Sequence, residues 1–111
     1  MKSRNFLFNI NEHGTAVFLG PTESRLMELA WNQSSVTVKS VIFHLGHETA
    51  PAYTTVMTIL GRLTDKGLLE RTRDGRNFVY RATIGRDAFI KNRVNHVLLC
   101  LKKNFPRFLE E

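Results

Sequence analysis

Hydroxyl and guanidinium groups repeat along one side of residues 52–66 in a pattern that suits contact with a nucleic acid. The residues on this side include Thr54, Thr55, Thr58 and Arg62, and Tyr53 in the same segment is a further candidate contact. Such side chains can hydrogen-bond to base edges or to phosphate oxygens, and threonine is short enough to let a helix approach a groove closely. A solvated helix face is the alternative, but threonine is a mediocre helix former. Taken alone, the segment is explained by a solvated face, but the clustering of threonine on that face calls for another reason, which the neighbouring segments supply.

The other side of the same segment predicts that it is a helix. Apolar residues recur at the i, i+3, i+4, i+7 spacing that builds a buried stripe, and they are Val56, Ile59, Leu60 and Leu63. Lys66-Gly67 then supplies a cation in the last turn and a residue that tolerates the left-handed cap. We expect a recognition helix over about residues 52–66.

A β-hairpin is expected over residues 68–82. Two stretches of β-compatible residues, 68–73 and 77–82, flank Asp74-Gly75-Arg76, which is a strong hairpin signal. Residues 62–81 contain six basic and three acidic residues, whereas residues 19–61 contain two basic and three acidic ones. Basic charge is therefore concentrated where a phosphate-binding surface needs it. An edge protected from aggregation by charge is the alternative. The candidate contacts on this wing are Arg71, Arg73 and Arg76.

Two further helices are expected upstream. One begins near Pro21 and ends near Asn32, and proline is well suited to the first helical position. The other has Thr37 as its N-cap and Gly46 at its end. Pro51 favours a turn before the third helix.

Three helices followed by a hairpin predict a mainly α fold with a small β-wing, namely a winged helix-turn-helix domain over residues 19–82. The expected partner is double-stranded DNA, with the recognition helix in the major groove and the wing, 68–82, on the backbone or minor groove. Lys39, on the second helix, completes the candidate DNA-binding residues. A winged domain used only for protein contact is the alternative from a different class.

Residues 83–111 carry a second apolar stripe at near-heptad spacing. Its members are Ile90, Val94, Val97, Leu98, Leu101, Phe105 and Phe108. A helix from about Arg86 to Asn104 would project from the winged domain and leave this stripe exposed unless a second chain covers it. We expect C-terminal dimerisation helices and a homodimer, with the helix interrupted before Pro106. A helix that folds back onto its own domain is the alternative.

A twofold axis has consequences for the DNA target. The two recognition helices would enter successive major grooves about 34 Å apart, so the operator is expected to be a palindromic inverted repeat. Two copies also supply the specificity that one small module lacks against the excess of nonspecific sites.

Composition narrows the function classes. The chain has 111 residues, 42% of them hydrophobic, a net charge of +6 and a pI near 10.0. Its one cysteine excludes an internal disulfide framework and fits a reducing cytoplasm, and no apolar run approaches a membrane span. No nucleophile motif or glycine-rich phosphate loop is present, so we expect that the protein is not an enzyme and uses no cofactor.

Two residue pairs have the spacing of metal ligands but do not suffice for a site. His96 and Cys100 are four apart, and His44 and His47 are three apart. No third and fourth ligand follow from spacing. A metal-responsive regulator is thus kept only as an alternative, and no metal site is assigned.

The first 18 residues form an extension for which a small hairpin is expected. Phe6, Phe8 and Ile10 alternate, residues 11–14 supply a turn, and residues 15–18 provide a second strand. A frayed tail is the alternative. The apolar side chains argue that something covers them, and the dimerisation helices are one such cover.

Over roughly residues 19–109 the chain resembles the penicillinase and methicillin-resistance repressors. The resemblance rests on residues 19–31, on Tyr-Thr-Thr-Val-Met-Thr-Ile-Leu at 53–60, and on Arg62-Leu63, Lys66-Gly67-Leu68, Asp74-Gly75-Arg76 and Tyr80. It implies an N-terminal winged-helix domain and a C-terminal dimerisation region that bind inverted-repeat operators and repress transcription.

The resemblance also carries expectations for single residues. It places Thr55, Thr58 and Arg62 at recognition-helix positions, whereas Thr54 stands where better-known members have a lysine, so operator preference is expected to differ. It further implies an upstream sensor or protease, with the Asn104–Phe105 bond as a candidate cleavage site.

Overall fold

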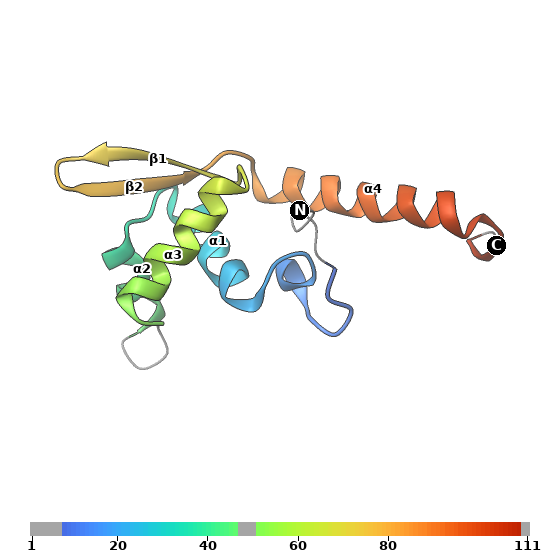
Figure 1. The fold of residues 1–111 in the computed structure, drawn as a ribbon, viewed down its shortest axis with the longest axis horizontal. Coiled ribbons are helices and arrows are strands. Elements are labelled where there is room, and N and C mark those ends of the chain that lie inside the picture. Colours follow the sequence, from blue (N-terminus) through green and yellow to red (C-terminus); the bar gives the residue numbers. More distant parts are fainter. Residues whose placement is uncertain (1–7, 47–50, 110–111) are drawn as a thin grey trace.

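Three helices and a hairpin form one end of the molecule, and a long helix projects from them as an arm (Figure 1). The computed structural model describes residues 8–46 and 51–109. Its principal extents are 55 × 28 × 27 Å, and the longest one reflects the arm. The elements are η1 (Gly14–Val17), α1 (Pro21–Gln33), α2 (Val38–Leu45), α3 (Tyr53–Asp65), β1 (Leu69–Asp74), β2 (Asn77–Ala82), α4 (Arg86–Asn104) and η2 (Pro106–Phe108).

Local capping explains why the helices begin where the sequence predicts. Pro21 occupies the first position of α1. At the start of α2, Thr37 Oγ1 accepts a hydrogen bond from the Ser40 amide at 3.0 Å, and Ser40 Oγ accepts one from the Thr37 amide at 2.8 Å. This reciprocal arrangement satisfies two amides that a helix start leaves unpaired. At the end of α2, Gly46 adopts a φ of 83°, a positive value that glycine tolerates because it has no Cβ.

The core lies between α1, α3 and the base of the hairpin. The apolar stripe expected on α3 faces this core, and Val56, Leu60 and Leu63 have no exposed surface. Tyr80 of β2 is 2% exposed, and Phe89 near the start of α4 is 2% exposed as well. The fully or nearly fully buried partners from the remaining elements are Leu19, Leu26, Met27, Ala30, Val36, Val41 and Leu69.

The hairpin confirms the expected wing and corrects its turn. β1 and β2 pair antiparallel with Arg73 opposite Phe78 and Asp74 opposite Asn77, so Asp74 belongs to the strand. The turn is the pair Gly75-Arg76, and Gly75 has a φ of 67°. A positive φ at the first turn residue matches a type II′ hairpin, which favours glycine there.

A short bridge adds a third chain segment to the wing. The Val36 amide donates to the Tyr80 carbonyl at 2.9 Å, and the Tyr80 amide donates to the Val36 carbonyl at 2.8 Å. The bridge fixes the base of β2 to the segment between α1 and α2. These elements together form the winged helix-turn-helix fold that the sequence predicts.

The prediction of an N-terminal hairpin is wrong for residues 8–18, the part of the extension that the structure describes. Residues 14–17 form the 3-10 helix η1 instead of a strand, and Phe6 lies outside the described residues. The Asn9 amide donates to the Val17 carbonyl at 2.6 Å, and the Asn9 side-chain amide donates to the carbonyls of Ala16 and Leu19. In a strand, the direction of the Thr15 side chain would follow from the alternation of side chains along the strand. The 3-10 helix instead places the Thr15 hydroxyl in a buried site against α1.

The arm begins on the winged domain and then leaves it. Phe89 is buried and Ile90 packs against the core, so only the first turns of α4 contact the domain's core cluster. The helix ends at Asn104, and η2 starts at Pro106, as the proline predicts. Among the described residues, no helix combines the length and apolar character that crossing a bilayer requires.

Candidate nucleic-acid interface

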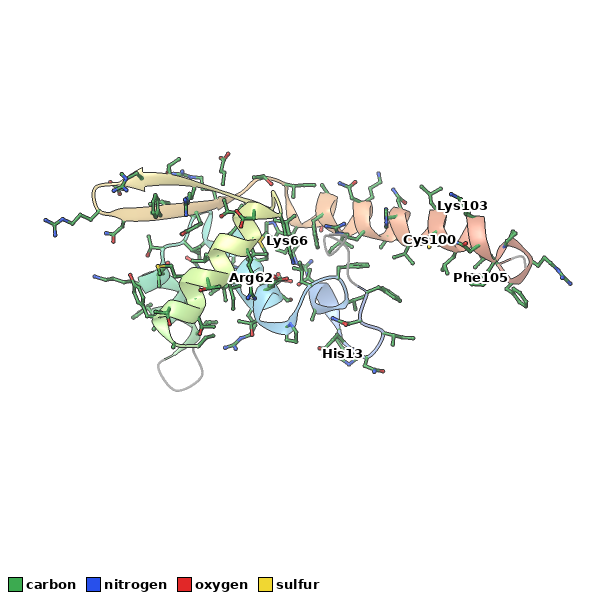
Figure 2. All side chains as sticks on the ribbon, in the orientation of Figure 1. His13, Arg62, Lys66, Cys100, Lys103 and Phe105 are labelled. Carbon is green, nitrogen blue, oxygen red and sulfur yellow. The ribbon has the colours of Figure 1, made fainter. Side chains whose placement is uncertain are left out.

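The outward side of α3 carries the polar residues that the sequence singled out. Thr54, Thr55, Thr58 and Arg62 are all exposed, and with Ile59 they line a shallow hollow on the surface. Arg62 is labelled on α3 in Figure 2, one turn before Lys66. The helix thus separates a fully buried apolar side from an accessible side of hydroxyls and one guanidinium.

One of these hydroxyls already has a backbone partner. Thr58 Oγ1 donates to the Thr54 carbonyl at 2.9 Å, one turn back along α3. Because a hydroxyl has a single proton and two lone pairs, Thr58 in this rotamer can accept from a base but cannot donate to one. A cytosine or adenine amino group is the matching donor in the major groove.

The wing holds two arginines over an aromatic ring. The Arg71 guanidinium carbon lies 4.3 Å from the centre of the Phe78 ring, and that of Arg73 lies 5.1 Å from it. Strand alternation places both arginines on the wing face that begins with buried Leu69 and Tyr80. Cation–π contacts of this kind restrict the side chains while their outer N–H groups stay accessible.

A groove of about 210 Å³ joins the wing to the starts of α2 and α3. It brings together three of the predicted residues, Lys39, Tyr53 and Arg76, although they come from three different elements. The remaining lining residues are Thr37, Val38, Met57, Asn77, Phe78 and Tyr80. The predicted residues thus divide into an α3 hollow, a wing face and this groove between them.

Sequence reasoning missed two polar members of the groove and misjudged one cation. Asn77 and Thr37 line the groove, and the only signal for Thr37 was its capping role. Lys66 was counted with the basic surface, but its Nζ lies 3.0 Å from both carboxylate oxygens of Glu23. Their side chains are 25% and 13% exposed. Lys66 therefore ties the end of α3 to the start of α1.

The predicted dimerisation residues lie along the arm. Ile90, Val97 and Leu101 are half-buried, whereas Val94 and Leu98 are 41% and 42% exposed. Phe105 and Phe108, beyond the end of α4, are 53% and 81% exposed. Four of the seven stripe residues are thus more than 40% exposed in a single chain, and the other three are partly covered.

The metal alternative gains no support. Within residues 8–46 and 51–109, no three His, Cys, Asp or Glu side chains are grouped to hold a metal ion. Cys100 Sγ is 3.6 Å from Asn104 Nδ2, one turn along the helix. His47, half of the second pair, lies outside the described residues.

Comparison with known proteins agrees with this geometry. The family model "Penicillinase repressor" matches residues 19–110. The penicillinase repressor of Bacillus licheniformis is 32% identical over 73 residues, which are 66% of this chain and 57% of that protein. The transcriptional regulator BlaI of Mycobacterium tuberculosis is 38% identical over 73 residues, 65% of this chain and 53% of that one. The chain thus spans little more than half the length of these relatives.

A solved structure covers the same region. The solution structure of the DNA-binding domain of the repressor BlaI is 31% identical, with a TM-score of 0.51, and the match covers 70% of this chain and 88% of that domain. The matched relatives are named a repressor and a transcriptional regulator, which agrees with the expectation of a protein that is not an enzyme. Since the family model extends over residues 19–110 of 111, the chain belongs to the penicillinase repressor family.

Proposed function

We propose that the chain is a DNA-binding transcriptional repressor that acts as a homodimer on an inverted-repeat operator. The observation that carries this proposal is the exposed hydroxyl and guanidinium side of α3 next to an arginine wing. The likeness to a domain described as the DNA-binding domain of a repressor supports it. The α3 helix lies in the major groove, and the wing follows the backbone or the minor groove.

Recognition of bases falls to the α3 hollow. Thr54, Thr55 and Thr58 let the helix backbone approach the groove floor, and Arg62 reaches guanine or a phosphate from the next turn. A bidentate arginine–guanine contact discriminates against a wrong base by about 1–3 kcal/mol. These side chains therefore set sequence preference.

The cations of the wing and groove contribute most of the affinity for DNA. Lys39, Arg71, Arg73 and Arg76 are exposed and can neutralise phosphates from both sides of the helix–wing junction. If each protomer neutralises about four phosphates, binding weakens on the order of a thousandfold or more between 50 and 200 mM salt. A flat salt response would contradict this role.

Dimerisation covers the stripe of the arm. Val94, Leu98 and Phe105 are large apolar side chains whose exposure in one chain is unfavourable. Pairing two arms about a twofold axis covers them and sets the two α3 helices to face successive major grooves, about 34 Å apart.

The proposed function is tested by selecting fragments of the host genome with the intact protein and footprinting them. Two protected half-sites related by inversion are expected. Arg62→Ala should relax the preference at one base pair of each half-site, whereas Lys102→Ala, a charge removal on the arm, should leave the preference unchanged. Failure of the intact protein to enrich any fragment would instead favour the protein-contact alternative.

Release of repression is proposed to involve the end of α4. The Asn104–Phe105 bond lies between α4 and η2, and Phe105 is 53% exposed. That exposure refers to a single chain, and pairing of the arms covers Phe105, but Asn104 is exposed and is not part of the stripe. A protease activated by an upstream sensor therefore approaches the bond from the Asn104 side. Sequencing of chain fragments from induced host cells tests this, and an intact chain during derepression would contradict it.

A further inference from the structure

The N-terminal extension is joined to both the winged domain and the arm by one hydrogen-bond network. Thr15 is 2% exposed, and its Oγ1 donates to Glu28 Oε2 at 2.7 Å. Since its single proton is used there, the Ser24 hydroxyl, 2.6 Å away, must donate to Thr15. Glu28 Oε1 accepts from Arg86 Nε at 2.9 Å. One carboxylate of α1 thus links η1 to the first residue of α4.

The Glu28 carboxylate is held in its charged form by these contacts. Burial by itself raises the pKa of Glu28, but the hydrogen bonds from Arg86 and Thr15 outweigh it and lower the pKa below its ordinary value. The network therefore remains charge-assisted near neutral pH, where such hydrogen bonds are stronger than neutral ones.

Aromatic rings form a second connection around the root of the arm. The Phe8 and Phe18 ring centres are 6.1 Å apart, and Phe18 and Phe89 are 6.5 Å apart in an edge-to-face arrangement. The Trp31 and Phe89 ring centres are 5.5 Å apart, and the Trp31 indole Nε1 donates to the Ile84 carbonyl at 2.9 Å. Phe89 of α4 therefore makes ring contacts with both the extension, through Phe18, and α1, through Trp31.

We propose that residues 8–19 act as a brace that fixes the direction in which α4 leaves the winged domain. Only residues 83–85 connect β2 to α4, and a connection that short sets the position of the arm but not its angle. The described part of the extension runs below α4 in Figure 1. Most of the brace precedes residue 19, where the family match begins.

A small change of angle at the root has a large effect at the tip. With 19 residues, α4 is about 28 Å long at 1.5 Å per residue, so a tilt of about 10° displaces its end by about 5 Å. That displacement exceeds the 3.4 Å between successive base pairs along one strand. Resting on the proposed dimeric, DNA-binding function, the brace therefore determines which half-site spacing the two α3 helices can bind.

The direction of the arm can be measured without DNA by pulsed electron spin resonance. One spin label is attached to Cys100, the single cysteine, and a second to an Asn32→Cys variant at the exposed end of α1. Mixing with an excess of unlabelled Cys100→Ser protein limits signals between protomers. The braced arm predicts a single narrow distribution of distances.

Matched variants then separate the brace from general stability. Thr15→Val removes the hydroxyl at nearly constant shape, whereas Thr15→Ser keeps it. Arg86→Gln removes the charge at a side chain that is 44% exposed, so the fold is expected to persist. Thr15→Val and Arg86→Gln should broaden the distance distribution, and Thr15→Ser should leave it narrow. A broad distribution in the parent, or an unchanged one in both disruptive variants, would overturn the brace.

A second measurement tests the consequence for DNA. On a footprinted genomic fragment, two base pairs inserted between the half-sites should weaken the parent at least tenfold, and Arg86→Gln should reduce this penalty severalfold. An equal penalty in both proteins would contradict the role in spacing. If the parent binds no fragment, the proposed function fails, while the label distances still decide whether the brace exists.

Discussion

At the scale of single residues, Phe78 restricts the two arginines of the wing that lie over its ring. Its ring lies beneath the guanidinium groups of both Arg71 and Arg73, which limits the freedom of two long side chains before any phosphate is met. Ordering a rotamer-rich side chain on binding costs about 0.5–1.5 kcal/mol. Pre-ordering by the ring reduces that cost.

Replacing Phe78 with leucine should therefore weaken DNA binding although no phosphate contact is removed. An exposed cation–π contact is worth about 0.5–1 kcal/mol, so the dissociation constant should rise about two- to fivefold. Phe78→Tyr keeps the ring and should bind as the parent does. Fluorescence anisotropy on a selected fragment measures both, and equal loss in the two variants would show that the ring face is not the cause.

Glu28 makes part of the stability depend on pH. Its folded-state pKa is lowered from the ordinary 4.5, so its contribution is present above the unfolded-state value and is lost as pH falls through the folded-state value. Glu28→Gln should melt below the parent at pH 7, and the difference in Tm should shrink as pH falls below about 4.5. A difference in Tm that stays constant with pH would contradict the pairing with Arg86 and Thr15.

At the scale of elements, the two sides of α3 differ in what they contribute: one side packs in the core, and the other is exposed. Leu60 has no exposed surface, and Thr54, six residues earlier on the same helix, is exposed. Leu60→Ala should lower the free energy of unfolding by about 2–5 kcal/mol, whereas Thr54→Ala should change it by less than about 0.5 kcal/mol. Urea denaturation followed by circular dichroism measures both. A large loss of stability in Thr54→Ala would mean that its side chain is structural.

The elements that sequence predicted well are those whose ends are set locally. The α2 helix begins after Thr37 because the Thr37–Ser40 exchange is encoded within four residues, and α4 ends before Pro106 because proline cannot continue it. The α3 stripe is equally local, since four apolar residues at helical spacing predict both a helix and its buried side.

The features that sequence missed depend on partners far along the chain. Thr15 lies in a 3-10 helix and not in the predicted strand, because its hydroxyl hydrogen-bonds with Ser24 and Glu28 of α1. Lys66 meets Glu23, which is 43 residues away. The bridge between Val36 and Tyr80 likewise joins distant segments. Spacing rules report which side of an element a residue occupies, but not which distant side chain it meets.

At the scale of the whole molecule, the proposed dimer depends on the arm to bring two winged domains together. Val94→Glu combined with Leu98→Glu places charges within the stripe and should give a monomer in sedimentation velocity, whereas the parent should sediment as a dimer. Leu99, 66% exposed and not part of the stripe, offers a control on the same helix, and Leu99→Glu should remain dimeric. Identical sedimentation of the two proteins would contradict dimerisation through this stripe.

The central claim, that α3 and the arginine wing bind duplex DNA, is tested most directly by comparing two double variants with equal loss of charge. Arg73→Ala with Arg76→Ala removes the wing cations, and Lys102→Ala with Lys103→Ala removes two cations of the arm, where Lys103 lies far from the wing (Figure 2). On a selected genomic fragment, the wing variant should bind at least tenfold more weakly than the parent and lower the salt slope by about one per lost phosphate contact, while the arm variant should bind nearly as the parent does. Equal binding by all three proteins would contradict the account.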